Sequence, residues 1–230
     1  EYSDKEFPSL QGLGDLVKMG ADNPDNIYQG CAINGNYDYR MTGTRGSVHY
    51  LGFGAISGGY GVDGKMITDG FIDSSELDIG HDGSFEIIVS AKEQEGNWLR
   101  TTADTRSVNI RQTFLDRSQE IKAELKIERL STDEKPAPFS AEKLTTALNH
   151  VNSYLNGTVK LFADWSASFK SDINTLPPAD QAYCQSIGGD PNIFYFHSYW
   201  ELADDEALVI DAKEIPECTT WNFQLDNYWL

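Results

Sequence analysis

Basic residues and long apolar runs are both scarce in this sequence, and each shortage excludes a class of protein. Eighteen Lys and Arg stand against 36 Asp and Glu, which gives a formal net charge of -18 over 230 residues. A surface of this sign repels phosphate and argues against nucleic acid and anionic membranes as partners. No segment reaches the roughly 18 consecutive apolar residues that a membrane-spanning helix needs. We therefore expect no membrane span. The charge leaves basic or neutral ligands open, and the favoured interpretation is that it simply keeps the protein soluble.

Metal-binding motifs are also missing. The three cysteines, Cys31, Cys184 and Cys218, form no CxxC pair, which argues against a zinc cluster. Free thiols are favoured over a Cys184–Cys218 disulfide, which stays open as an alternative. There is no HExxH motif, and we expect no metal or cofactor. The alternative is a metal site formed by His49 and His197 across the fold, with Asp or Glu as further ligands.

The two ends of the sequence resemble those of a trimmed or partial chain. Glu1 is not an initiator Met, and no signal-peptide pattern follows it. The last residues form an aromatic run that ends at Trp229 and Leu230 rather than in a polar tail. We expect residues to be missing at each end, in numbers that the sequence does not give.

Alternating hydrophobicity is the main structural signal. Aromatic residues make up 12% of the chain and there are 20 glycines, a combination that favours packed strands and tight turns. At 121–130, Ile121, Ala123, Leu125 and Ile127 are expected to face the core while Lys and Glu between them face water. The same period of two predicts strands at 37–42, 48–56, 85–89 and 107–116.

One region has helical rather than strand periodicity. Ser140 is a good N-cap, and Leu144, Leu148, Val151 and Leu155 fall on one helical face. Gly157 is expected to break this helix. A second helical segment then carries Leu161, Phe162, Trp165 and Phe169. We expect the pair to form a helical excursion at 140–176.

Apolar and aromatic runs return after the helical excursion. They predict further strands at 193–202, 206–212 and 219–230. Many short strands with turn residues between them are typical of an antiparallel two-sheet β-sandwich, here jelly-roll-like, with the helical insertion around residues 140–170 in a connection between the last strands. The expected organisation is an irregular lead-in over 1–30 and a single sandwich domain over 31–230.

Short motifs recur along the chain from Asp22 to the C-terminus. In the N-terminal and central parts they are Asp22-Asn23-Pro24-Asp25-Asn26-Ile27-Tyr28, Tyr39-Arg40, Arg45-Gly46, Tyr50-Leu51-Gly52-Phe53, Asp82-Gly83-Ser84-Phe85-Glu86, Gly96-Asn97-Trp98-Leu99 and 108–114 with Arg111-Gln112. The C-terminal group, which is the most specific, is Trp200-Glu201-Leu202, 205–210, Trp221-Asn222-Phe223-Gln224-Leu225 and Asn227-Tyr228-Trp229. In these motifs the chain resembles the bacterial family catalogued as domain of unknown function 1214.

The resemblance carries implications of its own. It implies a β-sandwich resembling jelly rolls, usually in the C-terminal half of a longer chain and sometimes beside a sister domain in secreted or envelope proteins. A few more residues normally follow the Asn-Tyr-Trp element. On this basis a secreted or cell-envelope location is favoured over the cytoplasm. The family supplies no catalytic residues, so none is transferred to this chain.

Exposed aromatic residues beside carboxylates are candidates for stacking on a flat ligand such as a sugar ring. Core and edge packing is the competing interpretation, because alternation places half of the aromatic residues of any strand inside. Trp200 beside Glu201 is the best candidate, since it precedes the acidic segment that contains Asp205. The tryptophans are Trp98, Trp165, Trp200, Trp221 and Trp229.

Two arginines, Arg40 and Arg111, lie on strands whose neighbours are expected to be buried. An unpaired buried charge costs about 3–5 kcal/mol, so each arginine needs a partner. A carboxylate such as Glu201 would make a structural clamp. A carboxylate or phosphate of a ligand would instead make a binding site.

Two functional hypotheses follow from the sequence. The first is a module for ligand binding or assembly, whose partner is a small polar ligand or a second copy in a homo-oligomer. The alternative is a hydrolase of a glycan or other small polar substrate, with Glu201 and Asp205 as paired carboxylates helped by His197 or Arg111. The two carboxylates would have to converge within roughly 5–9.5 Å.

Overall fold

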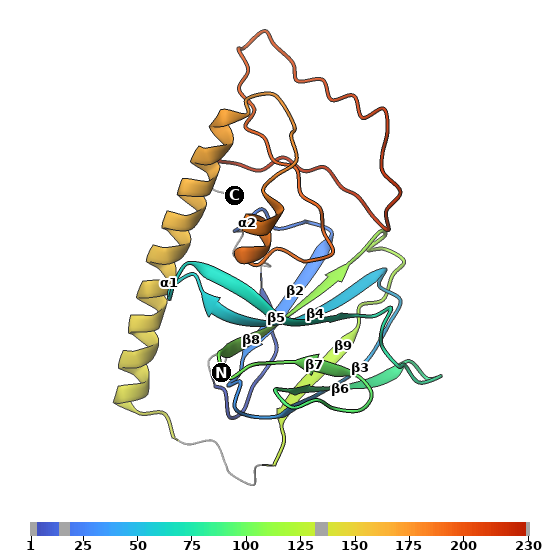
Figure 1. Cartoon of the computed structure of the whole chain (residues 1–230), viewed down its shortest axis with the longest axis vertical. Helices are drawn as coiled ribbons and strands as arrows, with labels where there is room; N and C mark the ends of the chain where they lie inside the picture. Colours follow the sequence, from blue (N-terminus) through green and yellow to red (C-terminus); the bar gives the residue numbers. More distant parts are fainter. Residues whose placement is uncertain (1–3, 14–18, 132–137, 229–230) are drawn as a thin grey trace.

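Two facing β-sheets form the body of the protein in a computed structural model that describes residues 4–13, 19–131 and 138–228. One sheet has five strands in the order β1-β2-β8-β4-β5, and the other has four in the order β7-β6-β3-β9 (Figure 1). Every neighbouring pair is antiparallel except β6 and β7. The first sheet consists of β1 (Gln11–Leu13), β2 (Asn26–Ala32), β8 (Thr105–Thr113), β4 (Tyr50–Gly59) and β5 (Lys65–Asp73). The second consists of β7 (Trp98–Arg100), β6 (Ser84–Ser90), β3 (Tyr39–Thr44) and β9 (Glu124–Arg129).

Alternate residues of each strand fill the space between the sheets, as the period of two predicts. Val108 and Ile110 on β8 are buried, and so are Phe114 just after it and Ile87 and Val89 on β6. The mainly β, two-sheet sandwich is therefore confirmed. Two of its strands, β1 and β2, begin within the first 30 residues, where the sequence predicts irregular structure.

A buried amide links the two sheets. Gln112 on β8 is fully buried, and its Nε2 donates to the side chain of Gln29 at 2.9 Å and to the carbonyl of Ala123 at 3.2 Å. Its Oε1 accepts from the backbone N–H of Ala123 at 2.7 Å. A polar side chain occupies this core position because the backbone N–H and C=O of Ala123, just before β9, are buried beside it. Buried backbone groups need hydrogen-bond partners, and Gln112 supplies them.

The β9 strand starts later than its pattern predicts. Ala123 and Ile127 are buried as expected, and Leu125 packs against the core. Ile121 is 66% exposed, although the pattern placed it inside. Its carbonyl accepts from the backbone N–H groups of Ser47 and Val48, which holds residue 121 in a loop before the strand begins.

A single helix, α1 (Ala141–Ser168), replaces the two predicted segments. Ser140 caps it as expected, with its hydroxyl accepting from the N–H of Lys143 at 3.1 Å. The helix continues through Gly157 because the glycine serves packing rather than termination. A Cβ at residue 157 would overlap the carbonyl oxygen of Tyr60, at the turn between β4 and β5. The helical insertion around 140–170 is confirmed, and the break within it was wrong.

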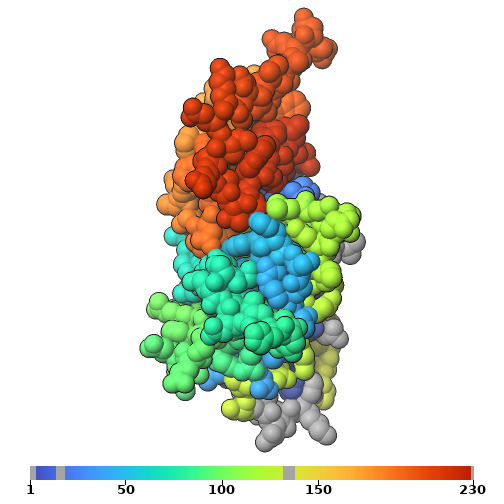
Figure 2. Space-filling model, turned by 90° about the vertical axis from the view of Figure 1, so that its right-hand side faces the viewer, coloured from blue at the N-terminus to red at the C-terminus, as the bar shows by residue number. Residues whose placement is uncertain are grey.

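The chain after α1 contains a short 3-10 turn, η1 (Phe169–Ser171), and one small helix, α2 (Gln181–Ser186). The strands predicted at 193–202, 206–212 and 219–228 are not formed, and positions 229 and 230 of the last one lie outside the described residues. In this described region the strand-like pairing consists of isolated β-bridges, such as Met66 to Ile187 and Pro178 to Phe196. We name residues 187–228 the C-terminal extension. In Figure 1 it loops away from the sandwich, and in Figure 2 it forms the protruding end of the molecule.

Candidate functional site

Arg111 anchors the C-terminal extension to the five-stranded sheet. Its Nη1 lies 2.8 Å from Oδ2 of Asp190, whose side chain is fully buried. Its Nη2 donates to the carbonyl of Gly188 at 3.0 Å. A guanidinium that holds both a carboxylate and a backbone carbonyl fixes the orientation of the loop that carries them. Arg111 is thus a clamp between β8 and residues 188–190.

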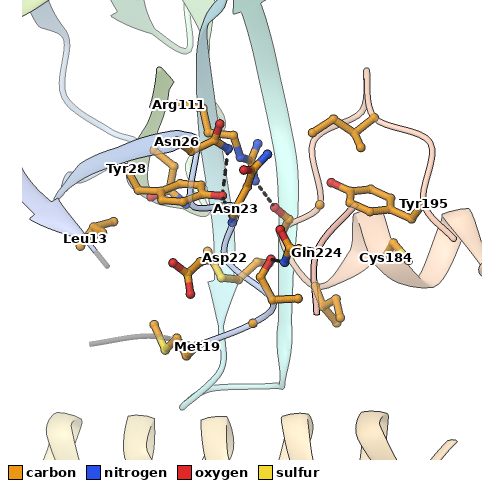
Figure 3. Close-up of a pocket in the computed structure, with 18 of the residues that line it drawn as sticks. Leu13, Met19, Asp22, Asn23, Asn26, Tyr28, Arg111, Cys184, Tyr195 and Gln224 are labelled. Carbon is orange, nitrogen blue, oxygen red and sulfur yellow. Dashed lines mark hydrogen bonds between the residues drawn. The ribbon is translucent and has the colours of Figure 1, made fainter. Parts of the chain in front are cut away.

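Three tyrosines lie close to this ion pair, and Figure 3 shows two of them, Tyr28 and Tyr195, on either side of Arg111. The hydroxyl of Tyr50 donates to Oδ2 of Asp190 at 3.2 Å. The hydroxyl of Tyr195 accepts from the backbone N–H of Asp190 at 2.9 Å. The ring of Tyr28 has its centroid 5.7 Å from the guanidinium carbon of Arg111, within the range of a cation–π contact.

Electrostatics in this cluster favour the charged arginine and the neutral phenols. Burial is the largest single effect and would lower the pKa of Arg111, but the charge of Asp190, the hydrogen bond to it and the phenols of Tyr195 and Tyr28 together leave that pKa above its ordinary value. Burial raises the pKa of Tyr50, with a further contribution from the charge of Asp190. Burial likewise raises the pKa of Tyr195, although the nearby Arg111 opposes it. Arg111 therefore stays charged, and the phenols of Tyr50 and Tyr195 stay neutral, at neutral pH.

The carboxylate predicted for Arg111 is present, but it is Asp190 rather than Glu201. Sequence reasoning missed Asp190 because it stands in the Gly188-Gly189-Asp190-Pro191 turn, a setting typical of a solvated loop. Tyr28 and Tyr50 were noticed only as parts of motifs. The sequence did indicate that Arg111 has a carboxylate partner, because a buried arginine on a central strand requires one. The strand pattern does not indicate which of the 36 Asp and Glu residues is that partner.

His197 lies within a group of aromatic rings at the C-terminal end of α1. Its ring centroid is 5.0 Å from that of Trp165 and 4.8 Å from that of Phe169. Tyr195 lies at 6.0 Å. Burial lowers the pKa of His197, and the charge of Asp226 partly opposes this shift. His197 therefore holds the C-terminal extension against α1 as a neutral aromatic ring.

The other candidate residues lie apart from the Arg111 cluster. Arg40 on β3 is 40% exposed rather than buried, and its Nη2 lies 2.5 Å from Oε1 of Glu128 on the neighbouring strand. Trp200 is 51% exposed, and Glu201 and Asp205 are exposed as well. Among the described residues, no hydrogen bond or ion pair joins Glu201 or Asp205 to Arg111 or His197. A ligand-binding role for these residues stays a prediction.

The remaining tryptophans are divided between packing and exposure. Trp98 donates from Nε1 to the carbonyl of Ser90 at 2.9 Å, and Trp165 packs in the aromatic group around His197. Trp221 is 63% exposed. Trp229 lies outside the described residues. Packing therefore accounts for two of these residues, while Trp200 and Trp221 present bare rings on the C-terminal extension.

All three cysteines are free thiols. Burial raises the pKa of Cys31 to about 12 and that of Cys184 to about 11. Cys218 is exposed, so it does not bond to Cys184. Within the described ranges no group of three or more His, Cys, Asp or Glu side chains is arranged to hold a metal ion.

One face of α1 carries a row of apolar side chains that are about half exposed. Five side chains, which we name the helix stripe, follow one another at intervals of three or four residues and are each 46–62% exposed. An amphipathic helix normally turns such a stripe toward a core. The helix stripe consists of Leu144, Leu148, Val151, Leu155 and Val159.

The C-terminal extension adds a second uncovered apolar surface. Val209 is 84% exposed, Phe194 61% and Leu225 67%. Between this extension, α1 and the sandwich lies an open hollow of about 3550 Å³. Pockets for small molecules usually measure about 300–1,000 Å³. This hollow is several times larger, and its walls are mainly apolar.

Comparison with solved structures shows what the chain is similar to. The chain is similar to the crystal structure of an uncharacterized protein from Burkholderia cenocepacia, with 49% sequence identity and a TM-score of 0.86. The match covers 89% of this chain and 57% of that chain, so this chain spans little more than half of the relative's length. Neither a protein-family model nor a curated protein matches. About 25 of the 230 residues stay unmatched, fewer than the C-terminal extension contains, so the similarity reaches into that extension.

No helix in the described part of the chain is both long and apolar enough to cross a membrane.

Proposed function

We propose that this chain is an assembly module, a β-sandwich that associates with a second copy of itself through the helix stripe and the C-terminal extension. The observation that carries the proposal is the helix stripe, five large apolar side chains on one face of α1 that each remain about half exposed in the described chain. Contiguous apolar patches of this kind mark interaction sites in soluble proteins.

Charge supports a second copy as the occupant of this face. Two chains of net charge -18 repel each other over most of their surfaces. Along α1, however, Lys143 and Lys160 balance Glu142 and Asp164, and residues 144–159 between them include no Asp, Glu, Lys or Arg. The face that carries the helix stripe is therefore also one where two acidic chains can approach without strong repulsion.

Family membership and location belong to the same proposal. The sequence motifs support a place in the bacterial domain of unknown function 1214 family, and the bacterial origin of the similar structure agrees with it. A secreted or cell-envelope location follows from that resemblance alone. Fractionation of the native host followed by immunodetection tests it, and detection only in the cytoplasm would contradict it.

Light scattering after size-exclusion chromatography tests self-association through the helix stripe. We expect the wild-type chain to elute at a multiple of 25.7 kDa. The Leu148→Gln, Leu155→Gln double variant keeps helix propensity while removing two apolar contacts, so it should shift toward the monomer. The matched control is Asn149→Gln, Asn156→Gln on another face of α1, which should behave as wild type. Equal masses for the wild type and the Leu variant would contradict the role of the stripe.

A further inference from the structure

One apolar segment of the C-terminal extension has the composition of a strand but no sheet to join. Residues 207–212 are Ala-Leu-Val-Ile-Asp-Ala, and β-branched residues lie at its centre. Leu208 is 36% exposed, Val209 84% and Ile210 50%. A run of this kind in a folded protein normally contributes its side chains to one or both faces of a sheet. We name it the unpaired run.

The backbone of the unpaired run is as uncovered as its side chains. Within the described residues, none of its N–H or C=O groups takes part in a hydrogen bond with protein. Just before the run, the N–H of Glu206 still bonds to the carbonyl of Ala203. An extended segment with a free backbone is what adds to the open edge of another sheet, where main-chain hydrogen bonds supply affinity.

The sandwich offers one long open edge to receive such a segment. Of the four edge strands in the described part, β1 and β7 have three residues each, and β5 is covered by α2 and bridged to Ile187. The fourth, β9, has six residues and pairs only with β3. Its length equals that of the unpaired run.

Charge also favours this pairing. Asp204, Asp205 and Glu206 directly precede the unpaired run. Residues 122–129, which include β9, hold three basic residues against two acidic ones in a chain that is otherwise strongly acidic. Lys122 and Lys126 are 54% and 73% exposed, and each makes a long surface contact with a glutamate of β9, Glu124 at 3.5 Å and Glu128 at 3.4 Å. Exposed pairs of this length are weak, so an incoming acidic segment can also reach the two ammonium groups.

We propose that residues 207–212 of one copy add as a strand to β9 of a second copy, and that the exchange is reciprocal and closes a two-fold dimer. The inference rests on the proposed function and specifies how the copies join. Reciprocal exchange uses both open elements of each chain, which leaves only the three-residue edges β1 and β7 and no long edge for further growth.

A proline substitution tests strand addition without disturbing the isolated chain. Val209→Pro removes a backbone donor from the middle of the run, and residue 209 makes no backbone hydrogen bond within the described chain. Its melting temperature at low concentration should therefore equal that of wild type. We expect the dimer dissociation constant, measured by sedimentation velocity on the full 230-residue chain, to rise about tenfold or more. Val209→Thr, which keeps the N–H and the β-branched shape, should stay within about threefold of wild type.

Disulfide trapping tests the acceptor strand. In a Cys218→Ser background, Val209→Cys chains are mixed with Lys126→Cys chains under mild oxidation, and we expect a cross-linked heterodimer. The control replaces Lys126→Cys with Lys92→Cys, an exposed position just beyond β6. A cross-link that forms with position 92 as readily as with position 126 would exclude β9 as the acceptor.

The outcomes separate the two proposals. If Val209→Pro dimerises as tightly as wild type while the Leu148→Gln, Leu155→Gln variant does not, strand addition is wrong and assembly through the helix stripe stands. If the wild-type chain is monomeric at every concentration, both proposals fail.

Discussion

At the scale of single residues, the Arg111–Asp190 pair has the strongest structural consequence. It joins β8 to the C-terminal extension through a carboxylate with no solvent exposure. Removing one member of a buried pair leaves the other charge without compensation, which costs more than the pair itself contributes. The pair therefore controls whether residues 188–190 stay on the sheet.

A double-mutant cycle measures how much the Arg111–Asp190 pair contributes to the free energy of unfolding. We expect Asp190→Asn to lower the free energy of unfolding by about 3 kcal/mol, because Arg111 keeps its charge in a buried site. Arg111→Met combined with Asp190→Asn should recover part of the loss. Urea denaturation provides the values, and Asp104→Asn, at an exposed position, is the control. A loss under about 1 kcal/mol for Asp190→Asn would show that water already compensates the arginine.

Thiol reactivity follows from burial in the same way. Cys31 and Cys184 are buried with pKa values raised to about 12 and about 11, whereas Cys218 is exposed. Because the thiolate is the reactive form, we expect one thiol per chain to react rapidly with Ellman's reagent at pH 8 and the other two only after unfolding. Cys218→Ser should abolish the fast phase. Two or three fast thiols in the native protein would contradict the packing around Cys31 or Cys184.

His197 gives the extension a dependence on pH. Burial lowers its pKa in the folded chain, so the unfolded state binds its proton first as the pH falls. The contribution of His197 to stability is complete above the ordinary histidine pKa and is lost as the pH falls through the depressed value. We expect His197→Phe, which keeps the contacts with Trp165 and Phe169, to lose less stability than wild type between pH 7.5 and 5.5. Urea titrations at both values measure this, with exposed His81→Phe as the control, and equal losses in wild type and His197→Phe would refute it.

At the scale of elements, Gly157 shows how packing overrides local propensity. Alanine is intrinsically better than glycine within a helix by about 1 kcal/mol. At position 157, however, a Cβ would overlap the Tyr60 carbonyl, which is backbone and unable to move aside cheaply. The contact holds α1 against the turn between β4 and β5.

Substitution of this glycine should therefore destabilise the protein. We expect Gly157→Ala to lower the free energy of unfolding by about 1–3 kcal/mol despite its higher helix propensity. Ser153→Ala, on an exposed part of the same helix, should be neutral or slightly stabilising. Thermal melts followed by circular dichroism compare the two variants. A Gly157→Ala chain as stable as wild type would mean that α1 does not rest on the turn.

The elements also show how far sequence patterns reach. Strands β3, β4, β6, β8 and β9 were predictable because each alternates apolar and polar residues over a length that one buried face requires. The break at Gly157 was wrong because sequence gives no sign of the Tyr60 backbone above it. The strands at 206–212 and 219–228 were wrong because β propensity reports a fit to a sheet, and no neighbouring strand lies beside them.

The candidate site was predictable only in part. A buried arginine on β8 predicts a carboxylate partner on physical grounds, and one is there. Its identity depends on the path of the extension after α2, which brings Asp190 rather than Glu201 to the sheet. The aromatic packing of His197 likewise depends on that path and on the C-terminal end of α1.

At the scale of the whole molecule, the protein divides into a part that buries its apolar side chains and a part that leaves many of them exposed. The sandwich buries its apolar residues and pairs its strands, while α1 and the C-terminal extension expose theirs. Proteins rarely leave this much apolar surface in water without a partner. Self-association explains the helix stripe, the open hollow and the unpaired run with one cause.

Sedimentation velocity of the wild-type chain over a wide range of concentrations is the most direct test of self-association. We expect the mean mass to rise with concentration from 25.7 kDa toward twice that value, and to stop there as a closed dimer requires. A mass that stays at 25.7 kDa at every concentration would contradict the account.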